Sequence, residues 1–199
     1  MIRRARLTLA TILVATAASA CFDGTGPAGT FAVTGRIQNN TGAPIPAGTR
    51  LVVIWTVSSG SPDYSYVYGE GVIDRITGMF GVRFAGPPPA AALNNGVLGV
   101  GLVVATTDHT LKDGDRLTDG SSLLASIVGL TPQHAVIFVD GHPDTLQVPT
   151  WATAFESGYS VGVGVKVPGS VFDKFVPVSP SSALLIIDAL ANIEVVNWT

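Results

Sequence analysis

The chain has 199 residues, enough for one domain with a sizeable core, and its 13% charged and 47% hydrophobic residues are typical of a folded protein, which excludes a disordered one. Three of the 11 basic residues and none of the 14 acidic ones precede position 21, which leaves the remainder with a net charge of −6. An acidic domain lacks the positive surface that nucleic acids require, so we expect no nucleic-acid partner.

Residues 1–20 have the order of a secretory signal peptide. Three arginines precede an uncharged, mostly apolar run over residues 7–17, and small residues occupy 18–20. The apolar run is well short of the ~20 residues that cross a bilayer as a helix. We therefore expect export of the chain and removal of residues 1–20.

The only cysteine, Cys21, directly follows this segment. A lone cysteine cannot form a disulfide within the chain, so we expect it to have another use. Ala18-Ser19-Ala20-Cys21 resembles the lipobox of bacterial lipoproteins. The resemblance implies that Cys21 is acylated, with palmitate among its fatty acids, and anchors the protein to a membrane. In that family an Asp after the cysteine favours the inner membrane, so Phe22 implies the outer one. Because Ala18 replaces the usual leucine, ordinary signal peptidase also suits this segment, and it would leave an unlipidated secreted or periplasmic protein.

Residues 21–30 are rich in Gly and small polar residues and predict a flexible tether before a domain that covers 31–199. Hydrophobic alternation predicts strands in 50–58, 80–84, 96–105, 134–139 and 161–167. The run 96–105 is apolar on both faces, as in a strand buried on both sides. One or two further strands are expected in 183–198, although Ser179-Pro180-Ser181 also suits a helix N-cap, and 123–130 fits either a strand or a helix.

Turn signals separate these runs at short intervals, and amphipathic helices are almost absent. The fold expected is all-β: a single antiparallel β-sandwich, immunoglobulin-like or transthyretin-like, with a possible internal boundary at the proline-rich stretch 86–95. The stretches 35–46 and 74–80, which read Gly35-Arg36-Ile37 through Thr41-Gly42-Ala43-Pro44-Ile45-Pro46 and Asp74-Arg75-Ile76-Thr77-Gly78-Met79-Phe80, are similar to carboxypeptidase-regulatory and transthyretin-like modules. That similarity implies a structural or adhesive module and no enzyme.

Two acidic stretches are candidates for metal binding. Asp140, His142 and Asp144 fall within five residues, a spacing from which a divalent cation can be held, although Asp-Gly and His-Pro also form polar turns. The stretch 108–120 contains several aspartates, but Leu117 stands where a calcium loop needs its next carboxylate. We therefore expect a solvated hairpin loop at 108–120.

Two further motifs allow a functional and a structural interpretation. The segment 158–162 matches the G-x-S-x-G pattern of serine hydrolases around Ser160, but the Val-Gly repeat after it favours a strand over the required helix. Tyr64, Tyr66 and Tyr68 share one face of a strand. An exposed row is a stacking platform for sugar rings, whereas alternation favours a row that fills the core.

These observations predict a non-catalytic exported envelope lipoprotein, without a cofactor, whose domain has a structural, adhesive or glycan- or protein-binding role. The alternative is a secreted metal-dependent hydrolase that uses Asp140, His142 and Asp144. Trp55, with Leu51, Val53 and Val57 on the same strand face, is expected to be a core residue in either case.

Overall fold

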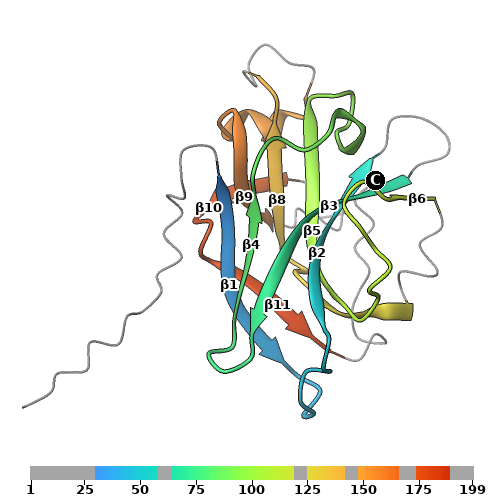
Figure 1. Cartoon of the computed structure of the whole chain (residues 1–199). Helices are drawn as coiled ribbons and strands as arrows, with labels where there is room; N and C mark the ends of the chain where they lie inside the picture. Colours follow the sequence, from blue (N-terminus) through green and yellow to red (C-terminus); the bar gives the residue numbers. More distant parts are fainter. Residues whose placement is uncertain (1–29, 58–63, 119–124, 142–147, 166–173, 189–199) are drawn as a thin grey trace, which may run out of the picture.

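A computed structural model describes residues 30–57, 64–118, 125–141, 148–165 and 174–188 (Figure 1). The predicted signal segment and Cys21 lie outside these residues. Within them the strands are β1 (Phe31–Asn39), β2 (Arg50–Val57), β3 (Tyr64–Asp74), β4 (Met79–Phe84), β5 (Leu98–Thr106), β6 (Arg116–Leu117), β7 (Ile127–Leu130), β8 (His134–Val139), β9 (Gly158–Val165), β10 (Lys174–Val178) and β11 (Ala183–Ile187).

Helical structure in the described part is limited to two 3-10 turns, η1 (Ala90–Ala92) and η3 (Thr150–Ala154), and to residues 125–126 next to β7. None of the described helical segments is long and apolar enough to cross a membrane. The all-β prediction is confirmed. The sequence left two stretches open between strand and helix, 123–130 and the region from 179 onward. In the structure, 127–130 (β7) and 183–187 (β11) are strands, and 179–182 forms a turn in place of a helix cap.

The strands close into a barrel. Antiparallel pairs join β5, β2, β3, β4 and β1 in that order, β11 pairs with β1 in parallel, and β7 links β11 back to β5 (Figure 1). Strands β8, β9 and β10 extend the sheet from β5 outside this ring. This arrangement differs from the predicted antiparallel sandwich, because one pair is parallel and the sheet closes on itself. Alternation shows which face of a strand is buried but not which strand lies beside it.

Strand β5 is the branch point of the sheet. One edge pairs with β2, while on the other edge Leu98–Gly101 pairs with β8 and Val104–Thr106 pairs with β7. Between the two partners, Thr131 N donates to Val103 O at 3.0 Å, and Val103 N donates to Thr131 Oγ1 at 3.3 Å. Thr131 is 1% exposed, so its hydroxyl and amide satisfy backbone groups that water does not reach.

The barrel interior is filled by an aromatic cluster around Trp55. The Trp55 ring is fully buried, lies 6.2 Å from Phe84 and 6.3 Å from Tyr159, and donates from Nε1 to Tyr68 O at 2.8 Å. It packs over Gly99 of β5, where an added Cβ would approach the indole to 2.7 Å. The predicted core position of Trp55 is confirmed.

A carbonyl of the proline-rich segment is bound by two tyrosines that pack in this interior. Gly86 O accepts hydrogen bonds from the Tyr159 hydroxyl at 2.9 Å and from the Tyr68 hydroxyl at 3.4 Å. Burial raises the pKa of Tyr159 far above its ordinary value, and the neighbouring Tyr68 adds to this. Both effects keep the phenol protonated, as a buried donor must be.

Strand β3 contains a β-bulge that reverses its faces. Val52 pairs with Glu70 but Ile54 with Val67, so β3 has one more residue than β2 between these pairs. Gly69 occupies the bulge with φ +107°, and a Cβ there would approach the Phe84 ring to 2.5 Å, so only glycine fits. The bulge turns Glu70 and the 63% exposed Val72 to the outside of the barrel.

Two smaller clusters cover the outside of the central strands. The loop residue Leu111 and strand β7 pack against β2 and β5, and the segment 148–155 packs against β5, β8 and β9. The predicted burial of 96–105 on both faces is therefore confirmed. The predicted strand at β9 is confirmed for residues 161–165; Phe155 and Phe175 cover its glycine face at Gly162, while on the valine face Val161 is buried and Val165 is 37% exposed.

Candidate functional site

A groove lies on the outside of the barrel, between η3 and the edge strand β10. Its volume is about 660 Å³, within the range of pockets that hold small ligands. Its walls are mainly apolar and are formed by Pro149, Thr150, Trp151, Ala154, Lys174, Phe175, Val176 and Pro177.

An aromatic trio positions the most prominent side chain of this groove, Trp151. The Trp151 ring meets Phe175 at 5.2 Å and 67°, and Phe155 at 5.9 Å and 87°. Both phenylalanines are buried, whereas Trp151 is only half-buried. Edge-to-face packing thus holds the indole on a fixed support and leaves part of it open to a ligand.

The glycine face of β9 explains why the trio lies there. A Cβ at Gly162 would lie 3.0 Å from Phe155 Cζ and 3.0 Å from Phe175 Cβ, so the missing side chain provides the space that both rings occupy. Pro149, with φ −54°, is the residue before η3, and the Thr153 hydroxyl donates to Thr150 O at 2.8 Å. The groove wall is therefore a short, locally hydrogen-bonded turn packed on a strand.

Lys174 is the one ionisable residue among the described residues of the groove wall. It is exposed, and within the described ranges no carboxylate pairs with it. Asp173 precedes it in the sequence and lies outside the described residues. Apart from that neighbour, the groove offers an ammonium group beside an apolar surface.

The tyrosine row faces the barrel interior. Tyr66 and Tyr68 pack against the inner cluster, and Tyr68 also bonds Gly86 O. Tyr64 stands at the end of the row, where the Arg116 guanidinium lies 3.7 Å above its ring. The row therefore has the inward orientation that alternation favours, and all three rings make contacts within the protein.

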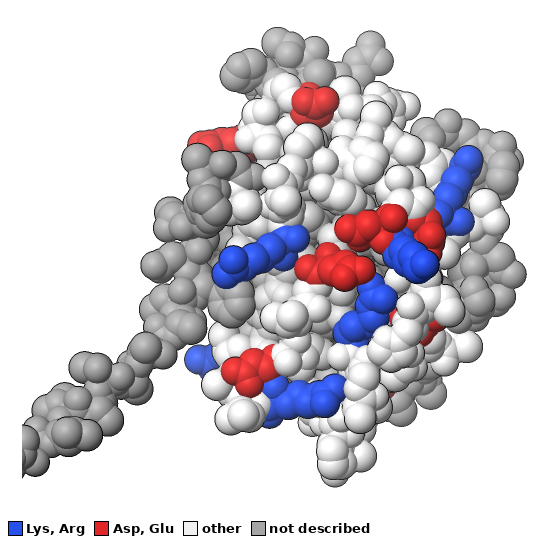
Figure 2. All heavy atoms as spheres, in the orientation of Figure 1, with Lys and Arg blue, Asp and Glu red and all other residues white. Residues whose placement is uncertain are grey.

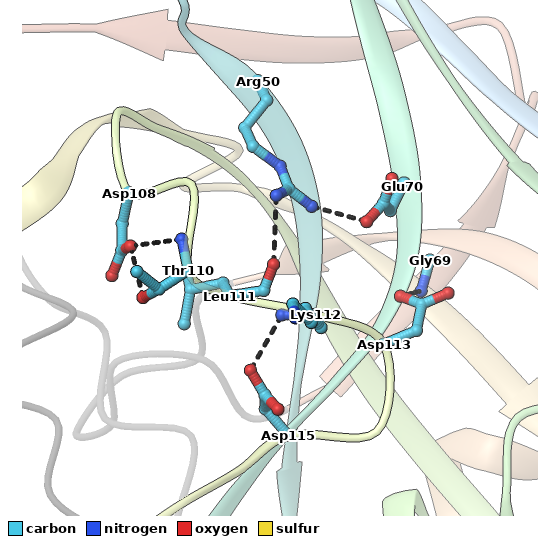
Figure 3. A network of polar contacts seen from close by, with 9 residues as sticks. All are labelled: Arg50, Gly69, Glu70, Asp108, Thr110, Leu111, Lys112, Asp113 and Asp115. Atoms are coloured by element: carbon cyan, nitrogen blue, oxygen red, sulfur yellow. Dashed lines mark hydrogen bonds and ion pairs between the residues drawn. The ribbon is translucent and has the colours of Figure 1, made fainter.

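The acidic stretch 108–115 forms a loop before β6, and its carboxylates accept hydrogen bonds from its own backbone (Figure 3). Asp108 Oδ1 accepts from Thr110 Oγ1 at 2.6 Å and from Thr110 N at 2.7 Å, and these bonds lower the pKa of Asp108. Asp115 Oδ2 accepts from Lys112 N at 2.8 Å. Within the described residues no three His, Cys, Asp or Glu side chains are grouped to hold a metal ion.

The same loop is tied to the barrel at the β3 bulge (Figure 3). Asp113 Oδ1 accepts from Gly69 N at 3.0 Å, and Arg50 donates to Leu111 O at 3.0 Å while it pairs with Glu70. The loop covers the outer apolar cluster of β2 with Leu111. Arg50, Glu70 and Asp113 therefore hold the loop against the barrel.

Two of the remaining candidates, Asp140 and Ser160, belong to the described residues. Asp140 is exposed at the end of β8 and donates its backbone amide to Val97 O, while His142 and Asp144 lie outside the described residues. Ser160 lies within β9, paired with Ile137 of β8. The predicted strand, in place of a strand-to-helix turn, is confirmed for Ser160.

Among the described residues, His134 has a buried side-chain nitrogen without a hydrogen-bond partner. It begins β8, and its Nδ1 atom is buried with no hydrogen-bond partner among the described residues. Burial lowers the pKa of His134 below its ordinary value. The imidazole is therefore neutral at pH 7.

On the face of the molecule shown in Figure 2, acidic and basic side chains lie interspersed among uncharged ones. No family model, no curated protein and no solved structure matches the chain. The assignment of a function therefore depends on the chain's own residues.

Sequence reasoning missed Trp151, Phe175 and Lys174. The available signal was the glycine row of β9, because glycine inside a strand often marks the close approach of another group. Nothing in the local pattern shows which residues approach, since the rings come from segments before and after β9.

Proposed function

We propose that this protein is an exported envelope lipoprotein, anchored through Cys21, whose β domain is a non-catalytic binding module. The observation that carries the proposal is the order of residues 1–21: arginines, an apolar run, small residues and the chain's only cysteine. The resemblance to the lipobox supports acylation at that position, and Phe22 supports the outer membrane.

The arrangement of the domain supports binding at its surface. Trp55, Phe84 and Tyr159 pack against one another in the interior, which favours a ligand site on the outside. The groove beside Trp151 offers a concave, mainly apolar surface there. The acidic loop is engaged in holding the fold, and the one described member of the 140–144 cluster, Asp140, stands exposed at a strand end.

Membrane fractionation of a Gram-negative host that expresses the full chain tests the anchor. We expect the wild type in the outer membrane, Cys21→Ala in the soluble fraction, and Phe22→Asp in the inner membrane. Thr25→Ala, a change in the tether that leaves the cysteine intact, serves as the matched control and should stay in the outer membrane. Retention of Cys21→Ala in carbonate-washed membranes would refute the lipid anchor.

A further inference from the structure

We infer that the groove between η3 and β10 binds a carboxylate-bearing sugar ring, stacked on Trp151 and paired with Lys174. This inference rests on the proposed binding role and gives that role a site and a ligand class. It is carried by three properties of the groove: its open aromatic surface, its size and its charge.

The aromatic surface suits a flat ring. Trp151 is held edge-to-face by two buried phenylalanines, and exposed Pro149 and Pro177 flank it in the groove wall. A pyranose presents an apolar C–H face that covers an indole and a hydroxylated rim that stays in water. A purely apolar ligand gains by removing its whole surface from water, which a groove open to solvent does not allow.

The size favours a short saccharide over a protein. Specific protein interfaces bury about 1,200–2,000 Å² and use about 20–30 residues on each side. Eight of the described residues line this groove, and its volume of about 660 Å³ lies in the range of small-ligand sites.

The charge favours an acidic sugar over a neutral one. Among the eight described residues of the groove wall, Lys174 contributes an ammonium group and none contributes a carboxylate. The ammonium group of Lys174 attracts an anionic ligand, an interaction that a neutral sugar does not make.

Isothermal titration calorimetry tests this inference. The mature full chain in detergent is titrated with trigalacturonic acid and, separately, with its fully methyl-esterified form. We expect the acid to bind about three- to fivefold more tightly than the ester, as an exposed ion pair provides. Trp151→Ala should weaken binding of both at least about tenfold, as loss of a stacking ring does. Lys174→Gln should remove the preference for the acid.

Lys112→Gln is the matched control, since it makes the same charge change on the exposed loop beside β3 and should leave both affinities unchanged. Lys174 is exposed, so Lys174→Glu should fold like the wild type, and it should bind the ester more tightly than the acid. Three results would each overturn the inference: equal affinity of the wild type for the acid and the ester, binding by Trp151→Ala as tight as by the wild type, or no binding at millimolar saccharide. A proline-rich or acidic peptide that binds in place of the sugar would overturn it as well. None of these outcomes alters the membrane fractionation, which tests the anchor separately.

Discussion

Replacing Trp55 by alanine removes the largest side chain of the barrel interior. Trp55 is fully buried between two aromatic rings and lies over Gly99 and Gly101, which have no side chains to fill the space that it leaves. Large-to-small changes of this kind cost about 3–5 kcal/mol. Loss of the indole N–H also leaves Tyr68 O without this donor, which costs about 1–3 kcal/mol. The sum approaches the entire stability of a marginal domain, about 5–15 kcal/mol.

Urea unfolding followed by far-UV circular dichroism measures this loss. Trp55→Ala is expected to be largely unfolded in buffer, whereas Trp55→Phe keeps most of the packing and loses mainly the hydrogen bond. Trp151→Ala is the control, because its half-open ring should cost less than about 2 kcal/mol. A Trp55→Ala protein that unfolds near the wild-type urea midpoint would show that the ring does not fill the interior.

Three further predictions concern the β5 glycine, the loop and the buried histidine. Gly99→Ala places a Cβ 2.7 Å from the indole and should cost about 1–3 kcal/mol in urea unfolding, while Gly86→Ala, which meets nothing within 4 Å, should leave the midpoint unchanged. Asp113→Ala removes the acceptor of the Gly69 amide and should lower the free energy of unfolding by about 1–3 kcal/mol, whereas Asp113→Asn, which keeps an acceptor oxygen, should lower it less. Equal stability of the wild type and both variants would contradict the role of this bond. Because burial lowers the folded-state pKa of His134 below 6.5, the unfolded chain binds more protons as the pH falls through that value, so stability should decrease from about pH 7.5 to about pH 5.5. His134→Gln should flatten this dependence, and an unchanged slope would refute the assignment.

Local sequence patterns predict the strands well where one physical rule decides the outcome. Residues 51–57 and 96–105 are apolar on both faces, and β2 and β5 are indeed buried on both. Ser160 lies in a strand because the Val-Gly repeat cannot continue as a stable helix. Trp55 is in the core because its neighbours two residues away are apolar.

The barrel and the groove depend on distant contacts that no local pattern contains. The parallel pairing of β1 with β11 joins residues such as Gly35 and Ala183, far apart in the chain. The bulge at Gly69 depends on Phe84 from β4 and on Asp113 from the loop, and it reverses the faces of the residues that follow. The groove combines Trp151 with Lys174, and only the pairing of β9 with β10 brings them together.

Mass spectrometry of the N-terminal peptide of the membrane-extracted protein tests the central claim most directly. The proposed function predicts a chain that begins at Cys21, with a diacylglyceryl group on the sulfur and a mass that shifts in steps of fatty-acid length. A chain that begins at an unmodified Cys21, or one that retains residues 1–20, would contradict the assignment of this protein as an envelope lipoprotein.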